Sequence, residues 1–140
     1  WDQQAKSLWV GTEKWPLRLV ELPLTTAAKA SKALSEARSI AAEQLAQTRW
    51  YSQGWGSLFL NDLAAVASSP ASGNLLLLSE ESALVAEYTP EGDYVSSLPL
   101  WRGAHGLARK IPQPEGMTLG PDGSLYIVSE PNLLYRYEKL

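Results

Sequence analysis

Short apolar runs that end in a hydroxyl residue and a glutamate recur three times along the chain. They read "SLWVGTE" at residues 7–13, "NLLLLSE" at 74–80 and "SLYIVSE" at 124–130. The short length and the flanking turn residues favour strands, although a buried helical turn would also be apolar throughout. The runs "LLLL" and "LYIV" lack strict alternation, which predicts strands buried on both faces.

Each repeat continues into a second strand-like run, and a leucine stands four residues after each terminal glutamate, at Leu17, Leu84 and Leu134. Turns are predicted before the second and third heptads, at 69–74 and 120–124, where Gly73 and Gly123 can adopt positive φ.

Further strands are predicted around these pairs. Apolar runs precede the two turns, and a hairpin leads from the second repeat into one more run; the segments are 63–67, 116–119 and 94–100. The unit is therefore an antiparallel meander of about four strands, which is the size of a propeller blade.

The first two repeats are separated by a longer interval than the last two, because residues 25–56 form an insertion. Residues 27–47 are rich in helix formers and carry an alanine and leucine stripe at helical spacing. This predicts a surface helix or a loop between blades, and an alanine stripe would bind a partner only weakly. Residues 49–59 mix aromatic residues with glycine and are predicted to form a loop.

The composition limits the function classes. The chain has 140 residues, 45% of them apolar, which fits one domain with a core. A net charge of −3 gives no basic field for nucleic acid. Cysteine is absent, so disulfides and cysteine-bound zinc are excluded. No apolar run is long enough to span a bilayer and no signal peptide opens the chain, which we interpret as part of a longer protein.

The candidate site is a set of acids at repeated positions. In a propeller, Glu13, Glu80 and Glu130 would end equivalent strands at one mouth, and Glu115 would begin an inner strand beside the channel. Clustered carboxylates suit a hard cation such as Ca²⁺, for which Glu115, Glu130 and Asn132 are the candidate ligands. Alternatively, each acid accepts hydrogen bonds from backbone N–H groups of its bend and only stabilises the turn.

Other candidates are weaker. His105 is the single histidine and lies in a polar loop, so Ser-His machinery is poorly supported. Nearby Arg102, Arg109 and Lys110 are most simply a solvated loop that could meet an anion. Trp9 is predicted to be core, while Trp50, Trp55 and Trp101 fall in predicted loops and fit junction packing or a binding rim.

Three segments carry a resemblance to a known family. They are "IPQPEGMTLGPDGSLYIVSEPNLLYRYEK" (111–139), "NDLAAVASSPASGNLLLLSEESALVAEY" (61–88) and "DQQAKSLWVGTEKWPLRLVEL" (2–22). They resemble the SdiA-regulated, YjiK-like family of bacterial proteins. The resemblance implies an all-β, six-bladed β-propeller outside the cytoplasm, behind an N-terminal membrane anchor. Residues 1–140 would then be its C-terminal half, about three four-stranded blades, with 25–56 inserted between blades. The chain departs from the family pattern at Ala64 and Ala65, where a polar residue and glycine are common.

Two functions from different classes follow. The first is a non-catalytic, periplasm-facing module that acts as a scaffold or binds a ligand or protein partner at the channel mouth. The alternative is a calcium-dependent hydrolase of lactones or phosphate esters at the propeller axis. Three blades would also leave two sheet faces open, so we expect pairing with a second copy or with a missing half.

Overall fold

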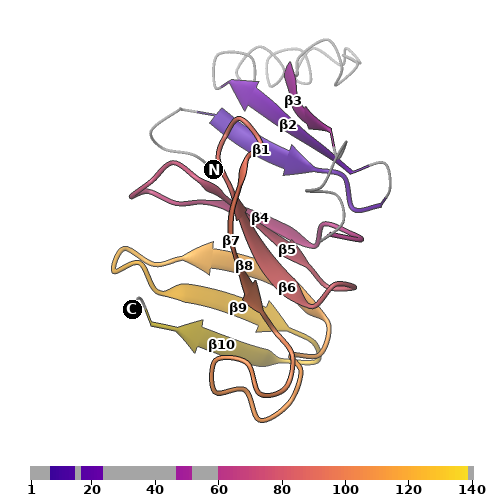
Figure 1. Ribbon diagram of the computed structural model, residues 1–140, viewed down its shortest axis with the longest axis vertical. Helices are drawn as coiled ribbons and strands as arrows, with labels where there is room; N and C mark the ends of the chain where they lie inside the picture. Colours follow the sequence, from indigo (N-terminus) through magenta and orange to yellow (C-terminus); the bar gives the residue numbers. More distant parts are fainter. Residues whose placement is uncertain (1–6, 15–16, 24–46, 52–59, 139–140) are drawn as a thin grey trace, which may run out of the picture.

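The computed structural model describes residues 7–14, 17–23, 47–51 and 60–138, and within them every regular element is a β-strand (Figure 1). The strands form three antiparallel sheets, so the all-β prediction is confirmed. The first sheet contains β1 (Ser7–Gly11), β2 (Arg18–Pro23) and β3 (Gln47–Tyr51). The middle sheet contains β4 (Ala65–Ser68), β5 (Leu75–Ser79), β6 (Leu84–Tyr88) and β7 (Tyr94–Pro99). The last sheet contains β8 (Pro114–Leu119), β9 (Leu125–Ser129) and β10 (Leu133–Tyr137).

Each strand pairs with its neighbour in the chain, as a meander requires. Gly73 and Gly123 have φ values of 76° and 81°, which confirms the reason for glycine in the turns before β5 and β9. Among the described residues, the expected four strands are present only in the middle sheet. Nothing in this part of the chain is a helix that could cross a bilayer.

The predicted insertion at 25–56 is wrong for residues 47–51. These form β3, which pairs with β2 so that Arg18 lies opposite Tyr51 and Val20 opposite Thr48. Thr48, Trp50 and Tyr51 belong to residue types that favour an extended backbone. The edge of β2 that does not pair with β1 forms hydrogen bonds with this strand. The alanine-rich stretch, apart from Gln47, lies outside the described residues, as do Trp55 and the rest of the predicted loop.

The turn between β8 and β9 is held by Asp122. Its carboxylate accepts hydrogen bonds from Ser124 N at 3.0 Å and Ser124 Oγ at 2.9 Å, and Arg136 Nη2 lies 3.2 Å away. These contacts, the Ser124 bonds foremost, lower the pKa of the Asp122 carboxyl. Because the folded pKa is lowered, this stabilisation is present at neutral pH and is lost as the pH falls through the folded value.

We therefore expect Ser124→Ala to raise the pKa of Asp122 toward its ordinary value, because one of its principal donors is removed. Arg136→Ala is also expected to raise this pKa, because the hydrogen bond and the charge of the arginine both lower it. NMR titration of the carboxyl carbon measures both. A carboxyl pKa that stays unchanged in both variants would contradict this assignment.

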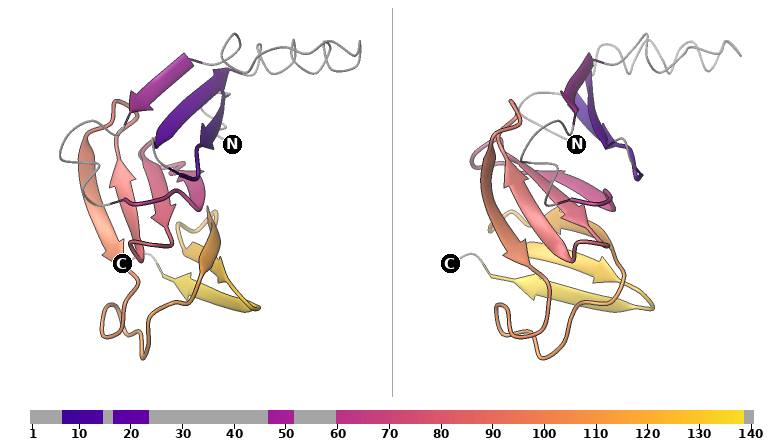
Figure 2. Two further views of the ribbon diagram at one scale, coloured as in Figure 1. Left: turned by 90° about the vertical axis from the view of Figure 1, so that its right-hand side faces the viewer. Right: turned by 45° about the vertical axis from the view of Figure 1, so that its right-hand side comes forward.

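Strand β5 and its neighbour β6 are largely buried on both faces, as the unbroken run of β5 predicted. The same prediction is wrong for β9, where Val128 is 50% exposed, and the edge strand β7 is mostly exposed. Leu77 packs in a cluster with Leu17, which directly precedes β2, and with Leu19 of β2. Its neighbour Leu78 points to the other face and packs with Leu125 and Ile127 of the last sheet. Figure 2 shows the middle sheet between the other two. The core is therefore two apolar junctions, one on each side of a single sheet.

The second and third heptads occupy equivalent places, since β5 and β9 each pair with a strand on both sides, but the leucines after them do not. Leu84 lies opposite Ser79 across the bend, whereas Leu133, not Leu134, lies opposite Ser129. The equal spacing of Leu84 and Leu134 from their glutamates therefore does not give them equivalent places in the ladder. The bends differ in length, so an equal spacing in sequence puts the third leucine on the opposite face of its strand.

Candidate functional site

Three of the predicted site residues line one surface pocket on the last sheet. Glu115, Glu130 and Asn132 share this pocket of about 440 Å³. The rest of its lining comes from β9, the bend after it and the start of β10: Val128, Ser129, Pro131, Leu133 and Leu134. The pocket thus brings together three candidate residues of neighbouring strands in one sheet, but not Glu13 or Glu80, which the repeat was expected to place beside Glu130.

A β-bulge positions Glu115. Pro114 pairs with Ser129 and Gly116 pairs with Val128, so Glu115 lies between them without a partner in the ladder. Bulges redirect a side chain and are common beside functional sites. Glycine at 116 has a steric reason, because an added Cβ would lie 2.7 Å from Val128 Cγ2. Glu115 and Gly116 together therefore place the Glu115 carboxylate beside the bend after β9.

That bend is fixed to the chain before β8. Glu130 N donates a hydrogen bond to Gln113 O at 3.1 Å, and Ser129 Oγ donates to the carbonyl of Pro112. Glu130, Pro131 and Asn132 are all exposed. The backbone is anchored while the polar side chains face solvent, which leaves them available to a ligand.

The charges in the pocket have one sign. Glu115 and Glu130 are both acidic, and among the described residues neither forms an ion pair. Asn132 adds a neutral amide that can donate or accept. Two uncompensated carboxylates beside an amide favour a cation or a ligand with cationic or hydrogen-bond-donating groups.

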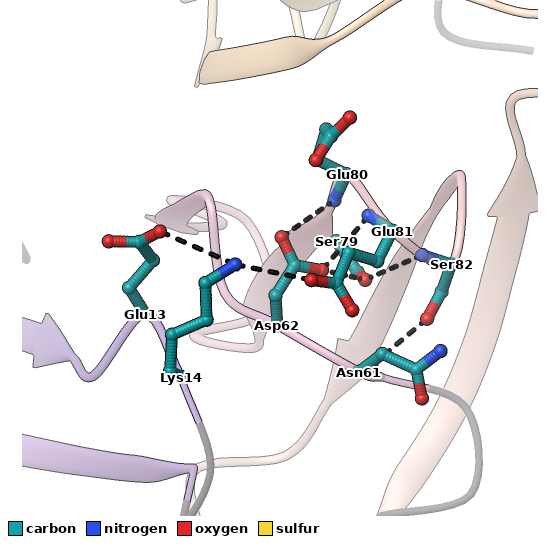
Figure 3. A network of polar contacts seen from close by, with 8 residues as sticks. All are labelled: Glu13, Lys14, Asn61, Asp62, Ser79, Glu80, Glu81 and Ser82. Atoms are coloured by element: carbon teal, nitrogen blue, oxygen red, sulfur yellow. Dashed lines mark hydrogen bonds and ion pairs between the residues drawn. The ribbon is translucent and has the colours of Figure 1, made fainter.

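Glu13 and Glu80 lie at a different place, where the first and middle sheets meet (Figure 3). Lys14 Nζ lies 3.5 Å from Glu13 and 3.1 Å from Glu81, so the lysine joins the two sheets. The hydrogen bond and the charge of Glu81 raise the pKa of Lys14. Glu80 carries its side chain away from this network in Figure 3. The five predicted site residues therefore fall into two groups.

Sequence reasoning missed Asp62, which is only 3% exposed. Its carboxylate accepts hydrogen bonds from Ser79 Oγ, from Glu80 N at 3.3 Å and from Glu81 N at 3.1 Å. Figure 3 shows it beneath the bend after β5. One alternative predicted that an acid accepts hydrogen bonds from the backbone N–H groups of its bend. In the middle sheet this acid is Asp62 and not the heptad glutamate, Glu80.

The hydroxyl residue of each heptad has a related role. Ser79 donates to Asp62 and accepts from Ser82 N at 3.1 Å. Ser129 donates to a backbone carbonyl, and Thr12 Oγ1 accepts from Arg18 N at 2.8 Å. The repeated Ser or Thr therefore stabilises the bend. Its recurrence is the sequence signal that could have indicated a hydrogen-bond partner such as Asp62.

The other candidate residues make few contacts that suggest a binding or catalytic site in the described part of the chain. Within the described ranges, no three His, Asp or Glu side chains approach closely enough to hold a metal ion. His105 is exposed with a φ of 47°, in a loop whose cations Arg102, Arg109 and Lys110 form no ion pair with any described residue. Trp9 packs against the core as predicted, and Trp101 is half exposed.

One comparison with known proteins bears on these features. The family model described as SdiA-regulated matches residues 1–138, nearly the whole chain. The match confirms the resemblance drawn from the three segments.

Proposed function

The chain belongs to the SdiA-regulated family, and from this membership and the pocket geometry we propose a non-catalytic ligand-binding module of the bacterial cell envelope. In this proposal the three sheets are successive blades of a β-propeller. Two observations support it: each sheet packs face to face on the next, and β4 is in contact with both β1 and β8. Strands β1, β5 and β9 would be equivalent members of neighbouring blades.

The pocket formed by Glu115, Glu130 and Asn132 is the observation that carries the binding role. Its two carboxylates, which form no ion pair with a described residue, and its one amide oxygen suit a hard cation, and Ca²⁺ is the ligand that we propose first. Calcium takes about six to eight oxygens, so backbone carbonyls, water or groups of a larger ligand would supply the others. A site with so few charged ligands belongs to the weak class, with a Kd of roughly 10⁻⁴–10⁻³ M.

Calorimetric titration of the folded chain with CaCl₂ tests this site. We expect saturable binding in that range, and we expect Glu130→Gln to weaken it about 10-fold or more because one of two charged ligands is lost. Glu91→Gln is the matched control, since Glu91 is exposed in the β6–β7 turn and outside the pocket. Equal heats from the wild type and the Glu130 variant would reject the pocket as the binding site.

The same samples separate binding from hydrolysis. We expect no turnover of a chromogenic lactone or phosphate ester above the rate of the Glu130→Gln variant, with or without Ca²⁺. Reproducible calcium-dependent turnover that the Glu130 variant loses would replace the binding role with the hydrolase alternative. Calorimetric binding without turnover would support the module that we propose.

A further inference from the structure

The connection between β7 and β8 carries three positive charges close together. Arg102, Arg109 and Lys110 are exposed in the segment 101–110, which we call the basic loop. None of the three forms an ion pair with a described residue, and the sequence has no acid in residues 94–114. The chain as a whole is acidic, with a net charge of −3, so this loop differs in sign from the rest of the molecule.

The basic loop is a fixed part of the fold. At its base, Ile111 N donates a hydrogen bond to Leu100 O at 3.0 Å, and both side chains are fully buried. Within the loop, Gly103 N donates to Leu107 O at 2.8 Å, and Leu107 packs against the core between the middle and last sheets. The loop therefore presents its charged side chains from a defined backbone.

An exposed aromatic side chain lies at the start of the basic loop. Trp101 is 50% exposed and directly precedes Arg102. Figures 1 and 2 show the loop, in orange, as a projection at one end of the molecule, beyond the strands. An exposed indole in one loop with cations suits the boundary between water and lipid. The ring prefers that interface, and the long cationic side chains reach the headgroups from it.

Magnitudes favour an extended anionic surface over a single anion or a protein. An exposed ion pair contributes little in water, so one phosphate or carboxylate held by one of these cations would dissociate easily. Near an anionic membrane each Lys or Arg strengthens binding about 5-fold, and three such effects multiply to roughly 100-fold. A specific protein interface needs roughly 20–30 residues a side, far more than the basic loop offers.

We propose that the basic loop is a contact site for the surface of a membrane that contains anionic phospholipids. In this arrangement Trp101 enters the headgroup region, and Arg102, Arg109 and Lys110 lie beside lipid phosphates. The same surface repels the acidic remainder of the chain, so the loop orients the molecule with this end toward the membrane. The contact is peripheral and reversible, since three charges and one ring bind far more weakly than an inserted helix. The inference does not rest on the proposed Ca²⁺ site.

Co-sedimentation with lipid vesicles in a buffer that contains EDTA tests the proposal. At low salt, we expect binding to phosphatidylcholine vesicles with about 30% phosphatidylglycerol, and roughly 100-fold weaker binding to pure phosphatidylcholine. Adding NaCl to about 0.5 M should remove most of this difference, because salt screens exposed charges.

Two matched variants locate the contact. Arg109→Gln should weaken binding to the anionic vesicles about 5-fold, because one of the three cations is lost. Arg136→Gln is the control, since it removes the same charge from an exposed arginine on β10, outside the loop. It should change the binding by less than about 2-fold, because charges more than a Debye length from the surface are screened.

Tryptophan fluorescence provides a readout that depends on insertion of the ring instead of on charge. Brominated phosphatidylcholine mixed into the anionic vesicles should quench the fluorescence of the wild type. Trp101→Phe should lose most of this quenching while still co-sedimenting, because phenylalanine keeps an aromatic ring but removes the inserted indole. Quenching that is unchanged in this variant would overturn the placement of Trp101 in the headgroup region.

The remaining outcomes separate a membrane from other partners. Equal binding to anionic and neutral vesicles overturns the proposal. Equal weakening by Arg109→Gln and Arg136→Gln means that net charge alone acts, which also overturns it. Soluble polyglutamate is the probe for an acidic protein. Saturable binding of polyglutamate that Arg109→Gln loses, without any binding to vesicles, would assign the loop to an acidic protein partner and overturn the membrane contact.

Discussion

Replacing Leu78 with alanine is expected to lower the free energy of unfolding by about 2–5 kcal/mol, and replacing Leu77 should cost about the same. Both side chains have no exposed surface, yet they are consecutive in β5 and point to opposite faces. Each replacement therefore opens a cavity at a different junction. Urea unfolding monitored by tryptophan fluorescence and by circular dichroism measures both losses.

The matched control for these variants is Val95→Ala on β7. That side chain is 46% exposed, so its loss should change the free energy of unfolding by less than about 0.5 kcal/mol. If the Leu77 or the Leu78 variant resembled the control, one face of the middle sheet would be open and the stack of three sheets would be incorrect. If the sheet is covered on both sides, the Leu77 and Leu78 variants should both lose a similarly large part of the free energy of unfolding.

Most of the strands could be predicted because their signals are local. An apolar run bounded by a glycine turn identifies β5, β9 and their partners from a few neighbouring residues. β3 was missed because glycine and tryptophan residues just beyond it resemble a loop. Its extended backbone depends on pairing with β2, a partner that lies across the alanine-rich stretch in the sequence.

The closeness of Glu115 and Glu130 was predictable from the meander, whereas the expected gathering of Glu13 and Glu80 beside them does not occur. The meander places Glu115 at the start of one strand and Glu130 at the end of its neighbour, so their shared pocket follows from antiparallel pairing. The bend lengths do not follow from the repeat, so the equal spacing of Leu84 and Leu134 did not reveal that they lie on different faces of their strands. The bulge at Glu115 could not be predicted from the sequence either, because it depends on how closely Gly116 approaches Val128.

Asp62 was missed for a related reason. It lies 17 residues before Ser79 and outside the heptad, in a segment with no regular structure before β4. Buried carboxylates are recognised by the donors around them, and these donors are backbone N–H groups, which every sequence contains. Only the folded bend brings the N–H groups of Glu80 and Glu81 to the same side as the Ser79 hydroxyl.

We expect Asp62→Ala to lower the free energy of unfolding by about 3 kcal/mol, because it removes a buried charged acceptor from one hydroxyl and two backbone donors. Asp62→Asn keeps one carbonyl oxygen and should cost less, about 1–2 kcal/mol. Asp93→Ala is the control, since Asp93 is exposed in the β6–β7 turn and should change stability by less than about 0.5 kcal/mol. Urea unfolding ranks the three variants, and hydrogen exchange of the Glu80 and Glu81 amides should be faster in the alanine variant. An alanine variant as stable as the Asp93 control would mean that water, and not Asp62, satisfies the bend.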